Sequence, residues 1–254
     1  NGTVLRGVGF RGGGYTDTPG ILPLTGAATT ELRGVHPPFF SEVFYPVQPW
    51  QVNYFEALSR GNGVTRLAVM PAQYRSANGS SFTGTLRQFN AVDFRLFYSN
   101  NTQTYGGNTP ALAAAPYIAK VLATSGPLAV DFEVTVVGDP SAGIQEVWVT
   151  YTALSGTYAG QWQSLDLAQD TNDSRLWKGS LPLNGTDPRD IRYLAQAVNG
   201  VGLVAFSTNL GAYYQPDVDP GAPSPDLTPT ALNLQASSAT GAYSTTAAFT
   251  ATLT

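Results

Sequence analysis

The chain has 254 residues, of which only 12% are charged, and its formal net charge is −4 with a pI near 4.9. That length is enough to bury a sizeable core and predicts one or two domains. The charged fraction lies well below the roughly 25% of typical soluble chains. Since no basic field is available, we do not expect a nucleic acid or an anionic membrane surface as a partner.

The sequence contains no cysteine, which excludes a disulfide framework, a thiolate metal site and a cysteine nucleophile. No window approaches the 18 consecutive apolar residues of a membrane-spanning helix. The opening residues NGTVLRGVGFRGGG lack the charged-then-apolar order of a signal peptide. We therefore expect a mature or excised piece of a longer protein.

Residues 1–36 are rich in Gly and Thr, with short apolar runs that predict two or three short strands or extended arms separated by Gly loops. Within them, RGVGFRGGG (residues 6–14) invites comparison with a phosphate-cradling loop. It lacks the Lys-Ser/Thr ending of such a loop, and no helix pattern follows it. We predict a flexible turn there.

Residues 36–98 are dense in aromatic residues and proline, and the prolines argue against helices and central strands in their neighbourhood. Between the prolines, TRLAVM (65–70) alternates as a strand does. We expect FTGTLRQFN (82–90) and AVDFRLFYS (91–99) to pair with it. The result would be a small antiparallel sheet with an aromatic core.

This stretch carries a family resemblance. Its landmarks, in order, are Pro37-Pro38-Phe39, Phe44-Tyr45-Pro46, the run RLAVMPAQY (66–74), Gly84-Thr85-Leu86-Arg87 and Phe94-Arg95-Leu96. In this order they resemble the propeptide segment of gingipain-type cysteine peptidases. The resemblance includes no catalytic residue, and a chain without cysteine cannot share the peptidase activity. It implies an inhibitory or docking role for the β-fold.

Residues 116–216 read as a series of short strands broken at regular intervals by turn formers, which is typical of a β-sandwich. We interpret ALAAAPYIAKV as the linker and first strand, because Pro110 and Pro116 bracket too short a run for a helix. About seven strands follow this spacing. In IQEVWVTYT, Val147, Val149 and Tyr151 alternate with Trp148 and Thr150.

Three tryptophans of this region, Trp148, Trp162 and Trp177, are predicted to pack in the core, with an exposed aromatic platform for sugar as the alternative. Asn199-Gly200, between apolar runs, predicts a hairpin with a type I′ turn. The runs VWVTYT, WQSLDL, LWKGSLPL, YLAQAVNGVG and STNLGAYY are similar to the immunoglobulin-like or fibronectin-III-like repeats of large bacterial surface proteins. The likeness, over about residues 118–254, implies a fold and an extracellular location more than a ligand.

Residues 217–229, rich in Pro and Asp, are predicted to be a semi-rigid linker. Residues 230–254 resemble the first two strands of a further immunoglobulin-like unit. One hairpin of that size cannot bury enough surface to be stable alone. We expect its open edges to pair with the N-terminal domain of this chain or with a neighbouring copy by strand addition.

The candidate metal ligands are the carboxylates of Asp166, Asp170 and Asp173 in the loop DLAQDTND. Such an oxygen-rich loop can bind calcium, but the EF-hand pattern is absent, and turn and cap hydrogen bonds are the alternative. We read Asp139, Asp187 and Asp190 as turn residues. No other cofactor is expected.

The remaining candidates point to no chemistry. His36, the single histidine, has no catalytic or metal-ligand spacing around it, so we expect a packed or solvated loop residue. Glu42 and Glu56 cannot be placed opposite another carboxylate as a glycosidase pair. Glycosylation sequons begin at Asn1, Asn78, Asn100, Asn172 and Asn184.

Together these observations predict an all-β chain with four parts: an N-terminal antiparallel β domain (1–115), an immunoglobulin-like sandwich (116–216), the linker (217–229) and the partial strands (230–254). We expect no enzyme activity. The predicted function is a structural or adhesive segment of an extracellular bacterial surface protein that can form a fibre by strand addition. A peptidase-associated prodomain and a carbohydrate-binding module are the alternatives.

Overall fold

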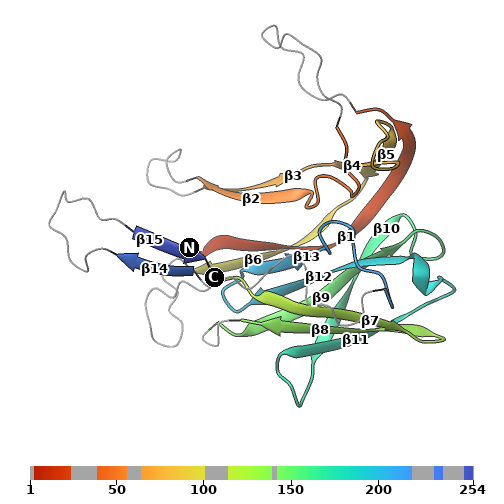
Figure 1. Cartoon of the computed structure of the whole chain (residues 1–254). Helices are drawn as coiled ribbons and strands as arrows, with labels where there is room; N and C mark the ends of the chain where they lie inside the picture. Colours follow the sequence, from red (N-terminus) through yellow and green to blue (C-terminus); the bar gives the residue numbers. More distant parts are fainter. Residues whose placement is uncertain are drawn as a thin grey trace, which may run out of the picture.

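The computed structural model describes residues 3–23, 39–55, 64–100, 114–138, 142–218, 232–236 and 249–253. In these ranges the fold is all-β, as predicted, with one short 3-10 helix at Pro188–Asp190 and no α-helix (Figure 1). Accordingly, no described helix is long and apolar enough to cross a membrane.

The second half of the chain forms a β-sandwich of seven strands, as predicted; its likeness to immunoglobulin-like repeats stays a prediction. The strands are β7 (Tyr117–Ser125), β8 (Ala129–Val137), β9 (Ile144–Ala153), β10 (Gln161–Gln169), β11 (Leu176–Pro182), β12 (Ile191–Asn199) and β13 (Val204–Ser207). One layer has the order β7-β8-β11 and the other β10-β9-β12-β13, and a short pairing of β10 with β11 joins them. The predicted alternation explains the core, since every second residue of β8, such as Phe132 and Val134, is buried between the layers.

The first strand organises the N-terminal half. β1 (Thr3–Ile21) pairs with β6 (Asp93–Asn100) over its first part and with β5 (Gly84–Phe89) over its second part, and β4 (Ala72–Ser76) pairs with the far edge of β5. In between, Gly13 and Gly14 pair with β10 of the sandwich. The prediction of several short strands around a flexible turn is therefore wrong, because residues 6–14 lie inside one continuous strand.

The pairing predicted for residues 65–70 is also wrong. β3 (Val64–Val69) pairs with β2 (Trp50–Phe55) as a separate two-stranded ribbon, whereas β5 and β6 both pair with β1. The strand pattern of these segments was readable, but their partners were not, because a single 19-residue strand supplies the edge for both.

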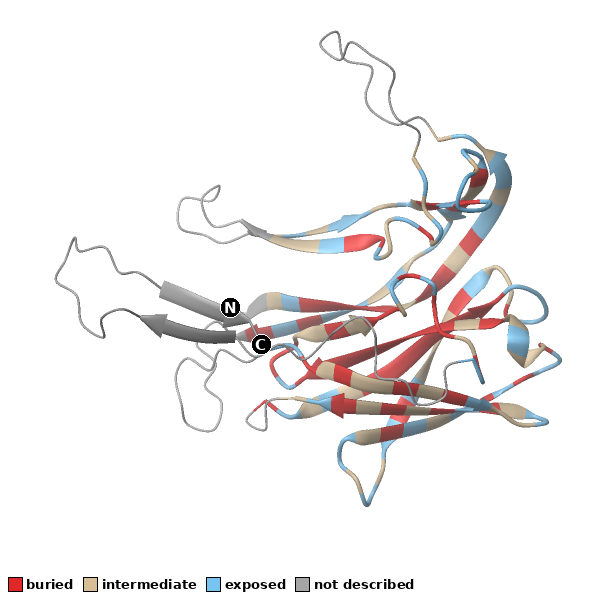
Figure 2. Ribbon diagram, in the orientation of Figure 1, coloured by how far each residue is buried: buried red, intermediate tan, exposed pale blue. Residues whose placement is uncertain are grey.

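The N-terminal strands form a third layer over the outer face of the sandwich (Figure 2). Val147, Val149 and Tyr151 of β9 point into the sandwich core, while Trp148 and Thr150 on its other face are buried beneath the N-terminal layer. The residues shared between the two halves include Val8, Phe10, Trp50, Trp162 and Leu194, which form one hydrophobic cluster. The boundary predicted near residue 115 falls between β6 and β7, and a common core lies across it.

The hairpin between β12 and β13 forms as predicted, but not with a type I′ turn. The backbone φ is positive at Gly202 (+85°) and at neither Asn199 nor Gly200. Instead, the Asn199 side chain accepts hydrogen bonds from the backbone N–H groups of Val201 and Leu203, at 3.1 and 3.0 Å. Asparagine thus closes a longer loop with its own carboxamide, which competes with the tighter turn.

Near the C-terminal end, β14 (Leu232–Ala236) and β15 (Phe249–Leu253) pair as an antiparallel hairpin. Most of the linker predicted at 217–229 lies outside the described residues. Asp217 belongs to the described part, and its carboxylate accepts a hydrogen bond from the backbone N–H of Ser125 on β7 at 3.0 Å.

The close contact between β1 and the sandwich generates a first prediction. A Cβ on Gly9 would lie 2.5 Å from the ring of Trp148, which is fully buried and has no room to move. We expect Gly9→Ala to lower the free energy of unfolding by about 1–3 kcal/mol, as overpacking does. Gly126→Ala is the control, because its nearest neighbour would be 3.4 Å away, and a change within about 0.5 kcal/mol is expected. Equal effects of both variants in urea denaturation would contradict tight packing at Gly9.

Candidate functional site

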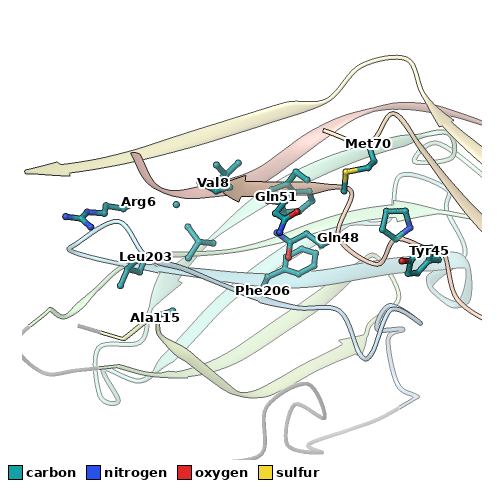
Figure 3. Close-up of a pocket in the computed structure, with 14 residues that line it drawn as sticks. Arg6, Val8, Tyr45, Gln48, Gln51, Met70, Ala115, Leu203 and Phe206 are labelled. Atoms are coloured by element: carbon teal, nitrogen blue, oxygen red, sulfur yellow. The ribbon is translucent and has the colours of Figure 1, made fainter. Parts of the chain in front are cut away.

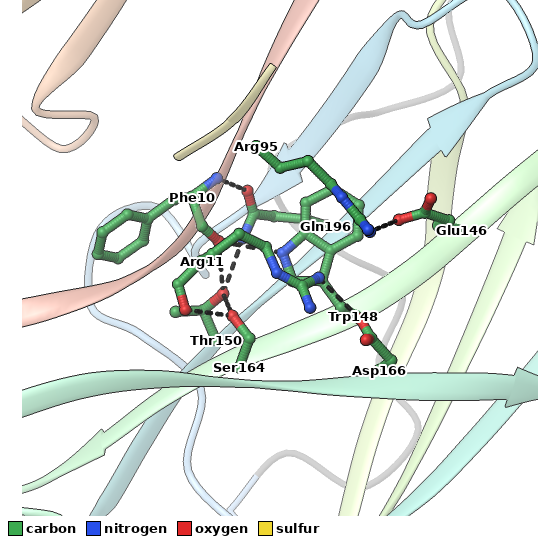
Figure 4. Close-up of polar contacts among 9 residues, drawn as sticks. All are labelled: Phe10, Arg11, Arg95, Glu146, Trp148, Thr150, Ser164, Asp166 and Gln196. Carbon is green, nitrogen blue, oxygen red and sulfur yellow. Dashed lines mark hydrogen bonds and ion pairs between the residues drawn. The ribbon is translucent and has the colours of Figure 1, made fainter. Parts of the chain in front are cut away.

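A buried set of polar side chains binds the backbone of β1 at Phe10 (Figure 4). Gln196 on β12 accepts a hydrogen bond from the Phe10 N–H at 2.9 Å and donates its own amide N–H to the Phe10 carbonyl at 2.8 Å. This carboxamide therefore pairs with both backbone groups of Phe10, as the peptide unit of a neighbouring strand would. Because Gln196 is completely buried, water cannot replace either bond.

Two further donors converge on the same carbonyl. The Trp148 indole N–H and the Thr150 hydroxyl donate to the Phe10 oxygen at 3.1 and 2.8 Å. Next to them, the Ser164 hydroxyl donates to the Arg11 carbonyl at 2.5 Å. These residues, which we call the β1 clamp (Phe10, Trp148, Thr150, Ser164 and Gln196), satisfy the backbone groups that β1 buries against the sandwich.

Ion pairs border the β1 clamp on the solvent side. The Arg11 guanidinium contacts the Asp166 carboxylate at 2.7 Å and lies 5.3 Å from the ring centre of Trp148. Arg95 on β6 pairs with Glu146 on β9. Both pairs join the N-terminal layer to the sandwich. Because they are partly exposed to solvent, each contributes little to the free energy of unfolding.

The β1 clamp predicts that the stability of one variant, Gln196→Glu, depends on pH. In Gln196→Glu, a protonated carboxyl can both donate and accept, whereas the carboxylate cannot donate to Phe10. Burial should raise the pKa of this carboxyl above its unfolded value near 4.3. The variant should therefore approach wild-type stability below about pH 4 and lose about 2 kcal/mol or more as the pH rises through the raised pKa.

The measurement is urea denaturation of both proteins from about pH 3 to about pH 8, a range that begins below that reference pKa. Gln161→Glu is the matched control, because Gln161 is exposed, and its difference from wild type should stay flat. A flat difference for Gln196→Glu as well would show that the clamp does not bury the side chain as described.

A buried arginine holds the other end of β1. The Arg87 guanidinium on β5 donates two hydrogen bonds of 2.8 Å to the Asp17 carboxylate on β1. Its central carbon lies 3.9 Å from the ring centre of Tyr15 and 4.0 Å from that of Phe44. Stacked between two rings, this cation is a fixed structural element with no open coordination for substrate.

A groove of about 650 Å³ lies between β1, β2 and β13 (Figure 3). Val8, Trp50, Val52, Val204 and Phe206 supply its apolar lining. Its volume falls within the roughly 300–1,000 Å³ of ordinary ligand sites.

Two carboxamides and one cation add polar groups to the groove. Gln48 and Gln51 line it and are exposed, and Arg6 lies toward one end (Figure 3). The Arg6 Nε–H also donates to the Ser99 hydroxyl at 3.0 Å. Among the described residues, the lining includes no Asp, Glu or His, and its polar side chains are the two carboxamides, the Arg6 guanidinium and the Tyr45 hydroxyl.

The structure gives each of the three predicted calcium ligands a cationic partner of its own. Asp166 pairs with Arg11, Asp170 with the Lys178 ammonium at 2.9 Å, and Asp173 with the Arg175 guanidinium at 3.1 Å. The described residues contain no group of three or more acidic or His side chains placed to hold a metal ion. Calcium binding by these carboxylates stays a prediction.

Turn chemistry is visible in the same loop. The Asp170 carboxylate accepts the backbone N–H groups of Asn172 and Asp173 at 2.9 and 3.2 Å. The Lys178 hydrogen bond, followed by these backbone donors, lowers the pKa of Asp170 to about 2. Asp187 similarly caps the short 3-10 helix by accepting from the Arg189 N–H at 2.9 Å, as the turn interpretation predicts.

The low pKa of Asp170 predicts how the stability of the fold changes in acid. A carboxyl with a depressed folded-state pKa stabilises the fold above its unfolded pKa of about 3.9 and loses that contribution as the pH falls toward 2. Asp170→Asn should therefore be less stable than wild type at neutral pH, with the difference disappearing between about pH 4 and 2. Thermal unfolding across this range measures it.

Calcium is decided by thermal unfolding at neutral pH, where EDTA chelates the metal. The turn and cap alternative predicts equal wild-type midpoints in calcium and in EDTA, because each carboxylate is already paired with a cation. A midpoint that calcium raises and EDTA restores, and that Asp170→Asn makes insensitive, would establish the metal site instead.

The other predicted residues are placed as follows. Trp148, Trp162 and Trp177 are buried as predicted, and so is Trp50. His36, Glu56, Asp139 and Asn1 lie outside the described residues. Asn78 is exposed in the turn before β5, and the Asn184 amide donates to the Tyr158 hydroxyl at 2.9 Å.

Sequence reasoning missed the groove and the β1 clamp. Gln196 and Thr150 looked like ordinary polar strand residues, although Gln196 stands within the apolar run YLAQAV, where a polar residue signals a buried partner. Gln48 and Gln51 flank Pro49-Trp50, but nothing in their spacing indicates that β13, some 150 residues later, lies opposite.

No protein-family model, curated protein or solved structure significantly matches this chain. No family role is therefore transferred to it.

Proposed function

We propose that this chain is a non-catalytic structural or adhesive segment of a large extracellular bacterial surface protein. The observation that supports this most is the β1 clamp, through which the N-terminal layer and the sandwich share buried hydrogen bonds. A spacer must transmit load without its parts sliding, and a shared buried polar network resists sliding because every broken bond leaves an unsatisfied group.

Aromatic packing adds to this connection. Phe10 of β1 lies 5.3 Å from Trp50 and 5.9 Å from Trp162, measured between ring centres. Trp162 belongs to the sandwich and also contacts Tyr213 at 5.0 Å. Such pairs contribute about 0.5–1.5 kcal/mol each beyond their buried area, so they favour one mechanical unit over two linked modules.

The adhesive and fibre-forming part of the proposal is supported by strands that lie at the ends of their sheets. β13 is at the end of its sheet, and β2-β3 and β14-β15 are two-stranded ribbons among the described strands. Open edges are templates for pairing with another chain. Strand addition is the partner mode that such edges favour.

The structure bears on the carbohydrate-binding alternative but not on the prodomain alternative. The carbohydrate-binding alternative, which needs exposed tryptophan and tyrosine, loses its tryptophans, because Trp50, Trp148, Trp162 and Trp177 are each at most 7% exposed. Tyr45 and Tyr98 are exposed, so this alternative stays a prediction that rests on tyrosine. The prodomain role, inferred from the resemblance of residues 36–98, stays a prediction. Its test is inhibition of a gingipain-type peptidase by the purified chain.

The spacer proposal predicts cooperative unfolding. We expect the backbone amides of β1 and β6 to become exchangeable at the same urea concentration as those of β9 and β12. Hydrogen–deuterium exchange with mass spectrometry across a urea series measures this for each strand. Release of β1 and β6 at a clearly lower concentration, with the sandwich still protected, would refute a single load-bearing unit.

A further inference from the structure

The described residues contain three Asn-Gly pairs, and one of them lies in a turn whose neighbours promote a reaction within the chain. We propose that Asn78 deamidates in the folded protein through a cyclic imide formed with the backbone nitrogen of Gly79. The other two pairs, Asn184-Gly185 and Asn199-Gly200, lie in surroundings that oppose this reaction. The modification is independent of the proposed structural role.

The reaction takes only water from outside the chain. The Gly79 nitrogen loses its proton and forms a bond to the Asn78 side-chain carbon Cγ, whose carbonyl oxygen becomes an oxyanion. The carbonyl then re-forms as the bond to Nδ2 breaks, and the amide takes up a proton and leaves as ammonia. Water opens the resulting imide at either carbonyl, which gives aspartate or isoaspartate at position 78. Glycine favours the attack, because it has no side chain to hinder its nitrogen and its backbone rotates freely.

The first group that promotes the reaction is Ser80. Its backbone N–H and its hydroxyl both donate to Asn78 Oδ1, each at 3.0 Å. These donors polarise the side-chain carbonyl and stabilise the negative charge that develops on its oxygen during the attack. Both bonds end on the oxygen, so neither holds the Nδ2 group that has to leave.

The second group is the Glu42 carboxylate, which lies against Gly79. Its Oε1 would be 2.6 Å from a Cβ added at Gly79, and both residues line a hollow of about 400 Å³ together with Asn78. A carboxylate beside the attacking nitrogen can accept its proton and pass it to the departing amide. Nucleophile, base and oxyanion donors therefore meet at one turn, whose residues Asn78, Gly79 and Ser80 are exposed to water.

The pair at Asn199 shows the opposite arrangement. The Gly200 N–H donates to the Ala142 carbonyl at 3.0 Å, so this nucleophile is already occupied. The Asn199 Nδ2 donates to the Ala114 carbonyl at 3.0 Å, and the residue is only 1% exposed. Backbone donors reach its Oδ1 as well. A held nitrogen, a held leaving group and the exclusion of water nevertheless oppose the reaction there.

The pair at Asn184 is exposed, but its side chain and backbone are fixed. The Asn184 Nδ2 donates to the Tyr158 hydroxyl at 2.9 Å. Its backbone φ is +48°, and its C=O accepts a hydrogen bond from the Thr157 hydroxyl at 2.8 Å. The attack needs rotation of both parts, which these contacts resist. The tertiary structure thus divides three identical dipeptides into one reactive pair and two protected pairs.

The modification alters the turn between β4 and β5. Either product adds a carboxylate to the hollow that Glu42 and Arg75 also line, and isoaspartate lengthens the backbone by one methylene group. The net charge becomes one unit more negative than −4, so ion-exchange chromatography separates the modified chain from the original one.

The test is a timed incubation of the full-length protein at neutral pH, followed by peptide mapping with mass spectrometry, which detects the mass gained when an amide becomes a carboxylate. We expect Asn78 to be converted at least about tenfold faster than Asn184 or Asn199, a ratio that a small difference in barrier produces. In urea, where the fold is lost, the three sites should react at similar rates, because each is an Asn-Gly pair.

Two variants test the promoting groups, each with a matched control. Ser80→Ala removes one donor to Oδ1 and should slow the conversion of Asn78 roughly three- to tenfold. Ser81→Ala should not slow it, because the Ser81 hydroxyl donates to the Thr83 carbonyl instead. Glu42→Gln should also slow the conversion, whereas Glu133→Gln, the same change of charge on β8 of the sandwich, should leave the wild-type rate.

Two results would overturn the proposal. Conversion of Asn78 in the folded protein at a rate no higher than that of Asn184 would show that the turn protects its own asparagine. Wild-type rates in both Ser80→Ala and Glu42→Gln would show that exposure alone sets the rate and that neither neighbour promotes the reaction.

Discussion

The contact between the backbone of β1 and the outer face of the sandwich is the constraint on which the rest of the structure depends. A strand can lie this close to a sheet only if its side chains leave room and its peptide groups find partners. The Cβ positions of Gly7 and Gly9 would lie 2.3 and 2.5 Å from the Gly202 carbonyl and the Trp148 ring. Glycine meets the first requirement, and the carboxamide of Gln196 meets the second.

That contact explains why the four-stranded layer of the sandwich is buried on both of its faces. In an isolated sandwich the outer residues of β9 and β12 would face water and be polar. Here the outer positions carry Trp148, Thr150, Leu194 and Gln196, all at most 2% exposed. Apolar members pack under β1, and polar members bind its backbone. The combination gives the interface geometric specificity as well as hydrophobic stabilisation.

The groove follows from where the third layer stops. β1 and β6 cover β9 and β12, while the β2-β3 ribbon continues beside β13 without pairing to it. The space between the ribbon and β13 is the groove, which Val52, Val204 and Phe206 line with apolar side chains.

The acidic loop after β10 shows how the same residues can serve different chemistry. Oxygen-rich spacing alone is compatible with calcium or with turns. In the folded chain, Lys178 and Arg175 lie beside Asp170 and Asp173. These cations neutralise the carboxylates locally and leave the loop tied to β11.

The sequence by itself determined the all-β class, the seven strands of the sandwich, the burial of Trp148, Trp162 and Trp177 and the hairpin at Asn199, because period-two alternation and turn formers act locally. Only the tertiary structure decided the partners of β3, β5 and β6, the role of the glycines in residues 6–14 and the place of the groove. All three depend on contacts between residues that lie about 150 or more positions apart in the chain, such as Phe10 with Gln196 and Trp50 with Phe206. No local pattern encodes such a contact, since glycine suits a turn and a close approach equally well.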